Sequence, residues 1–160
     1  MDEIKTSATT ELIKPELELA KRGIGADIAE KLMEIAEEAR KFSYSPYSQY
    51  SVGAALLSMD GVIYTGVNVE TAAMTGICAE RNALFKAVSE GQHRFLAMAV
   101  AGGKHDYASR SCNPCGVCRQ VLSEFVNEDF IIVVNDDEGN VKMLRFGDLL
   151  PYAFGPSNLK

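Results

Sequence analysis

Three of the four cysteines lie in one short stretch at three-residue steps. They are Cys112, Cys115 and Cys118, in CNPCGVC, while Cys78 stands alone upstream. Cysteines at C-x-x-C spacing are typical metal ligands. Glu80 follows Cys78 by two residues, and a carboxylate so close to a metal ligand can move protons between a metal-bound water and a substrate. These residues indicate a metal site that either stabilises the fold or reacts with water.

Three kinds of metal site are compatible with this pattern. All four cysteines could close a structural zinc site, and C-x-x-C-x-x-C is also part of an iron–sulfur ligand run. The run lacks the nearby fourth cysteine of such a cluster, and Cys112 lies before Pro114, off the helix predicted for the other two. We therefore interpret Cys112 as a bystander. A catalytic zinc with three protein ligands and an open position would use Glu80, whereas a structural zinc gains nothing from it.

The predicted elements place the cysteines at two helix starts. Cys78 opens a predicted helix over 78–91, and Cys115 and Cys118 lie in the first turn of another over 115–125. A helix N-terminus carries partial positive charge and free N–H groups, which stabilise a thiolate. Two such ends directed at each other would place three sulfurs around one zinc.

The remaining patterns predict a single α/β domain. Apolar residues recur at helical spacing over 26–42, and a short helix is expected near Pro151. Strands are predicted at 50–58, 62–69, 95–102, 130–135 and 141–146. The order α-β-β-α-β-α-β-β-α predicts a three-layer α/β/α sandwich around a five-stranded mixed sheet with a mainly parallel centre. Residues 1–25 are expected to form an extension that is compatible with one short helix, and 26–160 the catalytic domain.

Charge and composition narrow the class of function. The chain has 16 Lys and Arg against 22 Asp and Glu, a net charge of -6, and no basic run. Nucleic acid is therefore not the expected partner, because phosphate contacts need clustered positive charge. No secretory signal and no membrane-spanning run is visible, so we expect a cytoplasmic protein. In that reducing compartment clustered cysteines favour metal binding or catalysis over disulfides.

Two motifs together resemble a known family. C-A-E at 78–80 with P-C-G-V-C at 114–118 resembles the signature of the zinc-dependent nucleoside and nucleobase deaminases. The longer stretches YSPYSQYSVGAALL, GVNVE, CAERNALFKAVSEG, PCGVCRQV and LLPYAFGPS resemble the small-subunit, three-cysteine cytidine deaminases. The resemblance implies a cytidine deaminase-like fold and hydrolysis of cytidine and deoxycytidine to uridine and deoxyuridine plus ammonia. It also implies a homotetramer with one zinc per subunit.

The resemblance assigns roles at the reacting centre. Cys78, Cys115 and Cys118 would hold the zinc. Glu80 would take a proton from water, protonate N3 of cytosine and later deliver a proton to the leaving ammonia. The backbone N–H of Ala79 would bind the 2-oxo group of the base.

Two further residues match positions beside the ligand sulfurs. Arg81 would offset the negative charge of three thiolates on one Zn²⁺, because donors to the sulfurs withdraw charge from them. Gln120 matches a second position near the sulfurs. His93 and His105 match no site position and receive no role.

The substrate side is assigned in the same way. Asn68 and Glu70, which alternate along a strand and so point the same way, match the pair that binds the ribose hydroxyls. Tyr50 stands where the family usually has a phenylalanine against the base. Phe154 matches an aromatic residue that reaches a neighbouring subunit's active site.

Two departures leave the substrate open. Seven residues, TAAMTGI, separate Glu70 from Cys78, one fewer than the family leads us to expect. With the hydroxyl of Tyr50, this shortening favours the blasticidin S deaminases, which act on an antibiotic built on cytosine with a different sugar. Glu70 favours cytidine and deoxycytidine instead. The non-enzymatic alternative is a zinc-stabilised binding module, in which Glu80 would be dispensable.

Overall fold

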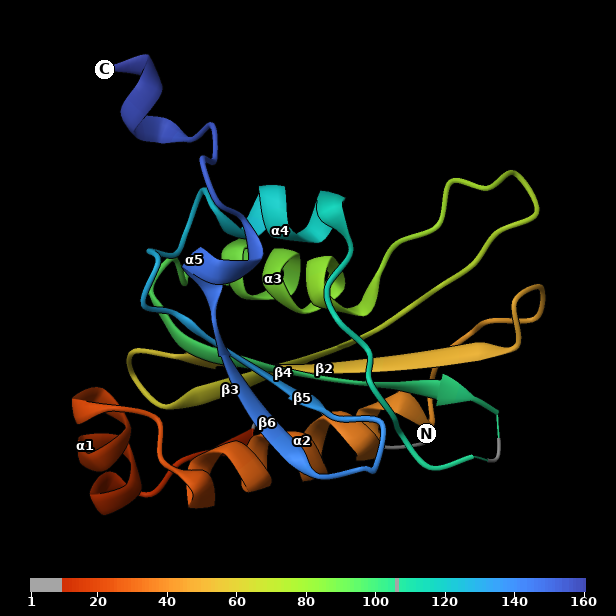
Figure 1. Cartoon of the computed structure of the whole chain (residues 1–160), viewed down its shortest axis with the longest axis horizontal. Coiled ribbons are helices and arrows are strands. Elements are labelled where there is room, and N and C mark those ends of the chain that lie inside the picture. The colour runs from red at the N-terminus through yellow and green to blue at the C-terminus, as the bar shows by residue number, and fades with distance from the viewer. Residues whose placement is uncertain (1–9, 106) are drawn as a thin grey trace, which may run out of the picture.

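A mixed β-sheet runs through the centre of the molecule, with helices on both sides of it (Figure 1). The computed structural model describes residues 10–105 and 107–160; residues 1–9 of the expected extension lie outside the described part. The sheet has six strands in the order β1-β3-β2-β4-β5-β6. The elements are β1 (Thr10–Glu11), α1 (Lys14–Arg22), α2 (Ala26–Arg40), β2 (Tyr50–Ser58), β3 (Val62–Val67), α3 (Ala79–Ser89), β4 (Phe95–Lys104), α4 (Gly116–Leu122), β5 (Ile131–Asn135), β6 (Val141–Arg145), α5 (Phe146–Leu149) and the 3-10 helix η1 (Pro156–Leu159).

The prediction of an α/β fold with a mixed sheet is confirmed, but the number of strands is wrong. All five expected strands are present. The sixth, β1, pairs antiparallel with β3 through two residues only, Thr10 with Ile63 and Glu11 with Val62. A two-residue strand carries no alternation of apolar and polar residues, so the sequence pattern does not reveal it.

The expectation of a mainly parallel centre is also wrong. Strand β2 pairs antiparallel with both β3 and β4, and the parallel pair is β4 with β5. The crossover through α3 does join two parallel strands, β3 and β4, but β2 lies between them in the sheet. Helix-separated strands therefore run in the same direction, as expected, without all being neighbours.

The two faces of the sheet are each buried under helices. Helices α1 and α2 lie on one side and α3, α4 and α5 on the other (Figure 1). Along β2, Ala55 and Leu57 belong to the apolar cluster with α2, while Ala54 and Leu56 belong to the cluster with α3. This explains why the central strands read as continuous apolar runs rather than alternating ones.

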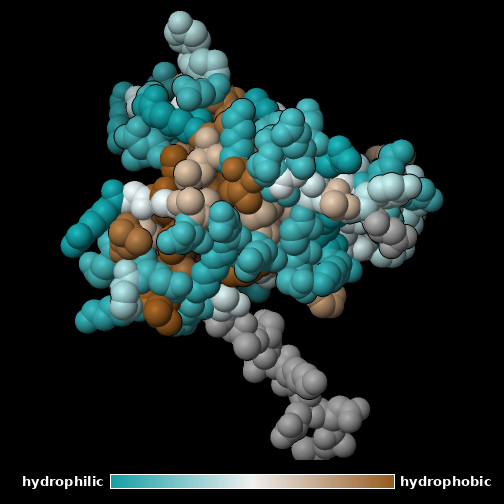
Figure 2. Space-filling view, turned by 60° about the horizontal axis from the view of Figure 1, so that its bottom comes forward, coloured by the Kyte–Doolittle hydropathy of each residue, from teal (hydrophilic) through white to brown (hydrophobic). Residues whose placement is uncertain are grey.

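Residues Lys14–Arg22 of the expected extension form the helix α1, which packs against α2. Ala20 is buried in the apolar cluster with α2. Glu16 accepts a hydrogen bond from the backbone N–H of Ile13 at 3.0 Å and pairs with Lys31 of α2 at 2.8 Å. The surface on this side is largely hydrophilic, with a band of hydrophobic side chains showing between the polar ones (Figure 2).

Glycine in β3 brings the helix that carries Cys78 directly onto the sheet. A Cβ atom on Gly66 would lie 2.3 Å from the backbone nitrogen of Ala83 and 2.4 Å from the carbonyl oxygen of Ala79. Contacts that close exclude any side chain. The first turn of α3 therefore rests on the β3 backbone, which fixes the position of Cys78 and Glu80.

None of the helices within the described ranges is long and apolar enough to cross a membrane.

Candidate metal centre and active site

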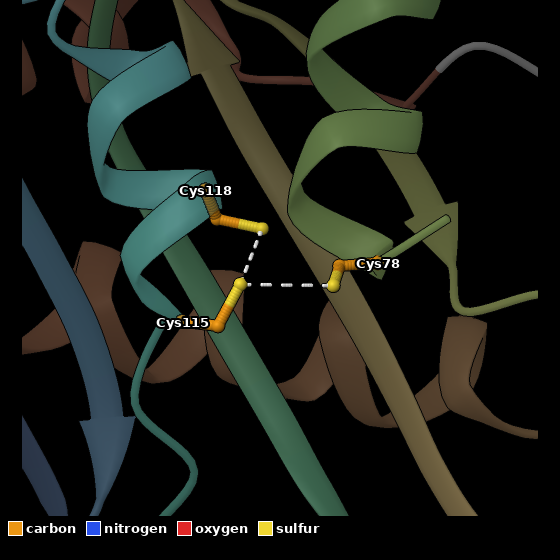
Figure 3. A group of neighbouring side chains, drawn as sticks. All are labelled: Cys78, Cys115 and Cys118. Carbon is orange, nitrogen blue, oxygen red and sulfur yellow. Dashed lines mark hydrogen bonds between the residues drawn. The ribbon is translucent and has the colours of Figure 1, made fainter. Parts of the chain in front are cut away.

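Cys78, Cys115 and Cys118 converge at the ends of two helices (Figure 3). Cys78 is the N-cap residue of α3, Cys115 is the N-cap residue of α4, and Cys118 lies one turn into α4. Their sulfurs are 3.9 Å apart for Cys78 and Cys115 and 3.5 Å for Cys115 and Cys118, and all three lie within 4.8 Å of one another. Tetrahedral zinc with bonds of about 2.3 Å holds its sulfurs about 3.8 Å apart. The three sulfurs therefore have the spacing of ligands to one zinc ion.

The pKa shifts of Cys78 and Cys118 favour a cation beside the sulfurs. The Cys118 thiol and the Arg81 guanidinium hold the pKa of Cys78 down to about 5. The neighbouring Cys78 and burial raise the pKa of Cys118. Two negative charges this close repel. A second thiolate beside Cys78 is therefore costly unless a cation such as a metal ion lies next to it.

Arg81 lies against the sulfur of Cys78. Its Nη2 donates to the Cys78 sulfur at 3.5 Å, and this contact raises the pKa of the guanidinium. Its Nε atom is buried and has no hydrogen-bond partner among the residues that the structure describes. The half-buried Arg81 thus directs its positive charge at the sulfur of Cys78.

Glu80 is buried beside the sulfurs, with 4% of its surface exposed. Burial is the main cause that raises the pKa of its carboxyl to about 7, and the charge of Cys78 adds to it. An acid with a pKa near the working pH can both take up and release a proton. The geometry therefore brings a proton-transfer group to the sulfur cluster.

A cavity of about 550 Å³ opens in front of this cluster. The volume is in the range of small-molecule sites. Cys78, Glu80 and Cys115 belong to its wall, and the remaining lining residues are Tyr47, Ser48, Val52, Asn68, Val69, Glu70, Thr71, Met74, Gly76, Ile77, Ala79, Cys112 and Asn113. A ligand in this cavity would face both the sulfurs and the carboxyl.

Asn68 and Glu70 both line the cavity and both hold its walls in place. The Asn68 amide donates to the carbonyl oxygen of Tyr50 at 2.9 Å and accepts from the backbone N–H of Val52 at 2.8 Å. Glu70 accepts from the backbone N–H groups of Tyr47 and Ser48 at 2.9 and 3.1 Å, and from the Ser48 hydroxyl. The Ser48 hydroxyl is the main cause that lowers the pKa of Glu70.

Ala79 is buried in the cavity wall at the first position of α3. Tyr50 is not among the lining residues. It is half-buried, and burial, with Cys112 nearby, raises its pKa to about 12. The base-facing position expected for Tyr50 is thus not part of this wall, whereas Val52, two residues further along β2, is. The sequence pattern gave no sign of Val52 because it reads as an ordinary strand residue.

Cys112 stands apart from the three clustered sulfurs, although it lies in the cavity wall. It packs against Gly102 of β4, where a Cβ atom would come within 2.3 Å of its sulfur. Burial raises the pKa of its thiol to about 11, so it stays protonated at neutral pH and is a poor metal ligand. It leaves the open side of the sulfur cluster to the cavity.

Gln120 and Phe154 of the same chain are not among the residues that line the cavity. The Gln120 amide donates to the carbonyl oxygen of Phe154 at 2.7 Å and to the Ser123 hydroxyl at 3.3 Å, rather than to a sulfur. The expected position of Gln120 near the ligand sulfurs stays a prediction. Phe154 is 60% exposed, on a C-terminal segment that projects from the body of the molecule (Figure 1).

Arg119 supports the metal centre and was missed in the sequence. Its Nε donates to the carbonyl oxygen of Pro114 at 2.8 Å and its Nη1 to that of Leu149 at 3.0 Å. It therefore ties the turn before Cys115 to the end of α5. Both partners are backbone carbonyls, which no side-chain pattern reveals.

Comparison with known proteins agrees with this site. A family model described as the cytidine and deoxycytidylate deaminase zinc-binding region matches residues 26–134. The cytidine deaminase of Sporosarcina psychrophila is 44% identical over 132 residues, which cover 81% of this chain and 93% of the relative. That of Halalkalibacterium halodurans is 42% identical over 125 residues, covering 77% of this chain and 91% of the relative.

Solved structures give the same result. The crystal structure of cytidine deaminase from Burkholderia pseudomallei superimposes with a TM-score of 0.71 and 42% identity, covering 78% of this chain and 98% of that one. The structure of the Mycobacterium tuberculosis cytidine deaminase has a TM-score of 0.67 and 38% identity, covering 79% of this chain and 96% of that one. The chain belongs to the cytidine and deoxycytidylate deaminase family.

Proposed function

We propose that this protein is a zinc-dependent cytidine deaminase that hydrolyses cytidine and deoxycytidine to uridine and deoxyuridine with release of ammonia. The observation that carries the proposal is the set of three sulfurs at single-zinc spacing beside a buried carboxyl, with Cys78, Cys115 and Glu80 in the wall of one cavity. Each subunit would bind one Zn²⁺ through Cys78, Cys115 and Cys118. A zinc ion with three protein ligands would keep its remaining position for water.

Glu80 moves the protons of the reaction. The zinc, when bound, acidifies water. Glu80 would accept a proton from the attacking water and donate it to N3 of cytosine as C4 is attacked. It would then take the proton of the new C4 hydroxyl and deliver it to the amino group, which leaves as ammonia while the C4 carbonyl forms. Its raised pKa suits both directions of transfer. The backbone N–H of Ala79, which has no partner within its own helix because it lies in the first turn, would donate to the 2-oxo group.

Arg81 keeps the metal centre from becoming too negative. Three thiolates and one Zn²⁺ sum to a net charge of about -1, which disfavours ionising the water. The contact from Arg81 to Cys78 draws charge from the sulfur and restores the acidifying effect.

The polar end of the cavity fits a sugar. Asn68 and Glu70 both line it, and the lowered pKa of Glu70 keeps its carboxylate ionised and able to accept hydroxyl hydrogens. We assign the ribose hydroxyls to this pair. Tyr50 would then act behind the wall rather than through direct contact with the base.

A modified cytosine nucleoside such as blasticidin S is the second candidate. The shortened segment 71–77 forms part of the cavity wall, through Thr71, Met74, Gly76 and Ile77. A different loop length at the wall changes the room for the sugar. The carboxylate of Glu70 in the same wall favours the unmodified nucleoside.

The wider assignments belong to the same proposal: a three-layer α/β/α domain over 26–160 after the extension 1–25, acting in the cytoplasm as a homotetramer, on free nucleosides rather than nucleic acid or membranes. Exposure of Phe154 on a projecting segment supports a contact with a neighbouring subunit's cavity. In that assembly Gln120, which holds the Phe154 carbonyl, would position the aromatic ring.

An absorbance screen tests the proposal. Cytidine, deoxycytidine, cytosine, adenosine and blasticidin S are each incubated with the zinc-loaded protein, and deamination is followed by the change in ultraviolet absorbance. We expect turnover of cytidine and deoxycytidine. Turnover of blasticidin S alone would select the second candidate, and turnover of adenosine alone would overturn the assignment. A zinc-loaded protein that deaminates none of them would be the binding module.

A further inference from the structure

A chain of hydrogen bonds leads from the surface histidine His105 to the cavity. His105 Nε2 lies 3.0 Å from the hydroxyl of Ser45, which lies 3.1 Å from the hydroxyl of Ser43. The Ser43 hydroxyl in turn bonds the side-chain oxygen of Asn68, and Asn68 lines the cavity. His105 is exposed, whereas Ser45 is buried. The histidine therefore reaches the cavity wall through two serines.

The Ser43 hydroxyl stands in the middle of this chain. Its hydrogen lies within bonding distance of two acceptors, the Asn68 side-chain oxygen and the Ser45 hydroxyl oxygen. Because the Asn68 side-chain oxygen only accepts, Ser43 is the donor in that contact. The donor in the contact between Ser45 and His105 Nε2 depends on the tautomer of the imidazole. The other ring nitrogen, Nδ1, lies 3.4 Å from the hydroxyl of Ser51, so both nitrogens of His105 have a serine partner.

This series of hydrogen bonds holds the side-chain amide of Asn68 in one orientation. Its oxygen faces Ser43 and the backbone N–H of Val52, and its nitrogen faces the carbonyl oxygen of Tyr50. The same histidine holds the adjoining loop, because its backbone N–H donates to the carbonyl oxygen of Gln49 at 3.1 Å. Loop residues Tyr47 and Ser48 belong to the cavity wall. One residue thus restrains both polar walls.

We propose that His105 is a positioning residue for the sugar end of the substrate, acting through Ser45 and Ser43 on Asn68. This inference rests on the proposed function, in which Asn68 binds the ribose. His105 does not touch the substrate or the reacting atoms. Its loss weakens nucleoside binding and leaves the chemistry at the zinc unchanged.

Steady-state kinetics with cytidine and the affinity for the product uridine test the proposal. We expect His105→Ala to raise KM and the uridine Kd about three- to tenfold, the effect of one lost hydrogen bond, with kcat within about twofold of wild type. His105→Gln should restore most of the affinity, because the glutamine amide carries both a donor and an acceptor and so replaces Nε2 as the hydrogen-bond partner of Ser45. His93→Ala is the matched control: this exposed histidine stacks on Phe125, and its loss should change neither value.

A double variant separates positioning from general loosening. Ser45→Ala cuts the same chain, so the pair His105→Ala and Ser45→Ala should weaken uridine binding no more than either alone. Additive effects, or a fall in kcat with unchanged KM, would overturn the positioning role. So would His105→Ala with wild-type KM. If the wild-type protein neither deaminates cytidine nor binds uridine, the proposed function itself fails and the positioning role falls with it.

Discussion

Gly66→Ala should damage the metal centre although Gly66 touches no sulfur. The new Cβ atom would lie 2.3 Å from the backbone nitrogen of Ala83, whereas ordinary contacts begin at 3.4 Å. Helix α3 must therefore move away from β3 by about 1 Å, since both contacting atoms are backbone and cannot rotate aside. Zinc sites tolerate errors of only about 0.2 Å in ligand distances. The shift carries Cys78 and Glu80 out of place together.

Two measurements check this prediction. Overpacking costs about 1–3 kcal/mol, which lowers Tm by about 2–12 °C for a chain of this size. Competition with a chromogenic chelator should show zinc affinity reduced by about 10- to 100-fold, the size of effect found when groups that orient ligands are lost. Cytidine turnover should fall with the zinc content.

Gly116→Ala is the matched control because this glycine lies between two ligands, Cys115 and Cys118, yet nothing lies within 4 Å of its Cβ position. It is the first residue of α4, and alanine has a higher helix propensity than glycine. Zinc affinity and Tm should therefore stay at their wild-type values. If Gly66→Ala kept wild-type zinc affinity and Tm, the close packing of α3 on β3 would not be what positions Cys78.

Two further substitutions test the surroundings of the sulfurs. Arg81→Ala should lower zinc affinity or turnover by about 10- to 100-fold, because its contact to Cys78 is lost. Lys86→Ala, which removes an exposed charge from the same helix, should change neither. Equal zinc affinity and equal turnover of the two variants would argue against a specific role for Arg81. Cys112→Ala should retain one zinc per chain by metal analysis, because the Cys112 thiol stays protonated and apart from the cluster; loss of the metal would make Cys112 a ligand.

Helices and long strands were predictable because their patterns are local. The apolar spacing over 26–42 and the continuous run over 95–102 correspond to α2 and β4. The two-residue strand β1 and the placement of β2 between β3 and β4 depend on contacts far apart in the sequence, which no local pattern encodes. The sheet order therefore needed the structure.

The residues of the site also fall into two groups: those that a motif predicted and those that only the structure revealed. The ligand spacing in 114–118 and the C-A-E motif predicted that three sulfurs and Glu80 lie close together. The structure places the three sulfurs in one cluster with Glu80 beside them. The supports of the site were not visible in the sequence, because Arg119 bonds backbone carbonyls and His105 acts through two serines. The bond from Gln120 to the carbonyl of Phe154, on the C-terminal segment beyond Pro151, was likewise not visible in the sequence.

Ammonia release from cytidine by the Glu80→Gln variant, with its zinc content measured in the same sample, tests the central claim most directly. Glutamine keeps the size of the side chain and removes its ability to transfer protons. We predict one zinc per chain, an unchanged fold, and a rate lower by about 10²–10⁴-fold or more, because proton transfer is lost at two steps. A zinc-loaded Glu80→Gln protein that deaminates cytidine at the wild-type rate would contradict the mechanism.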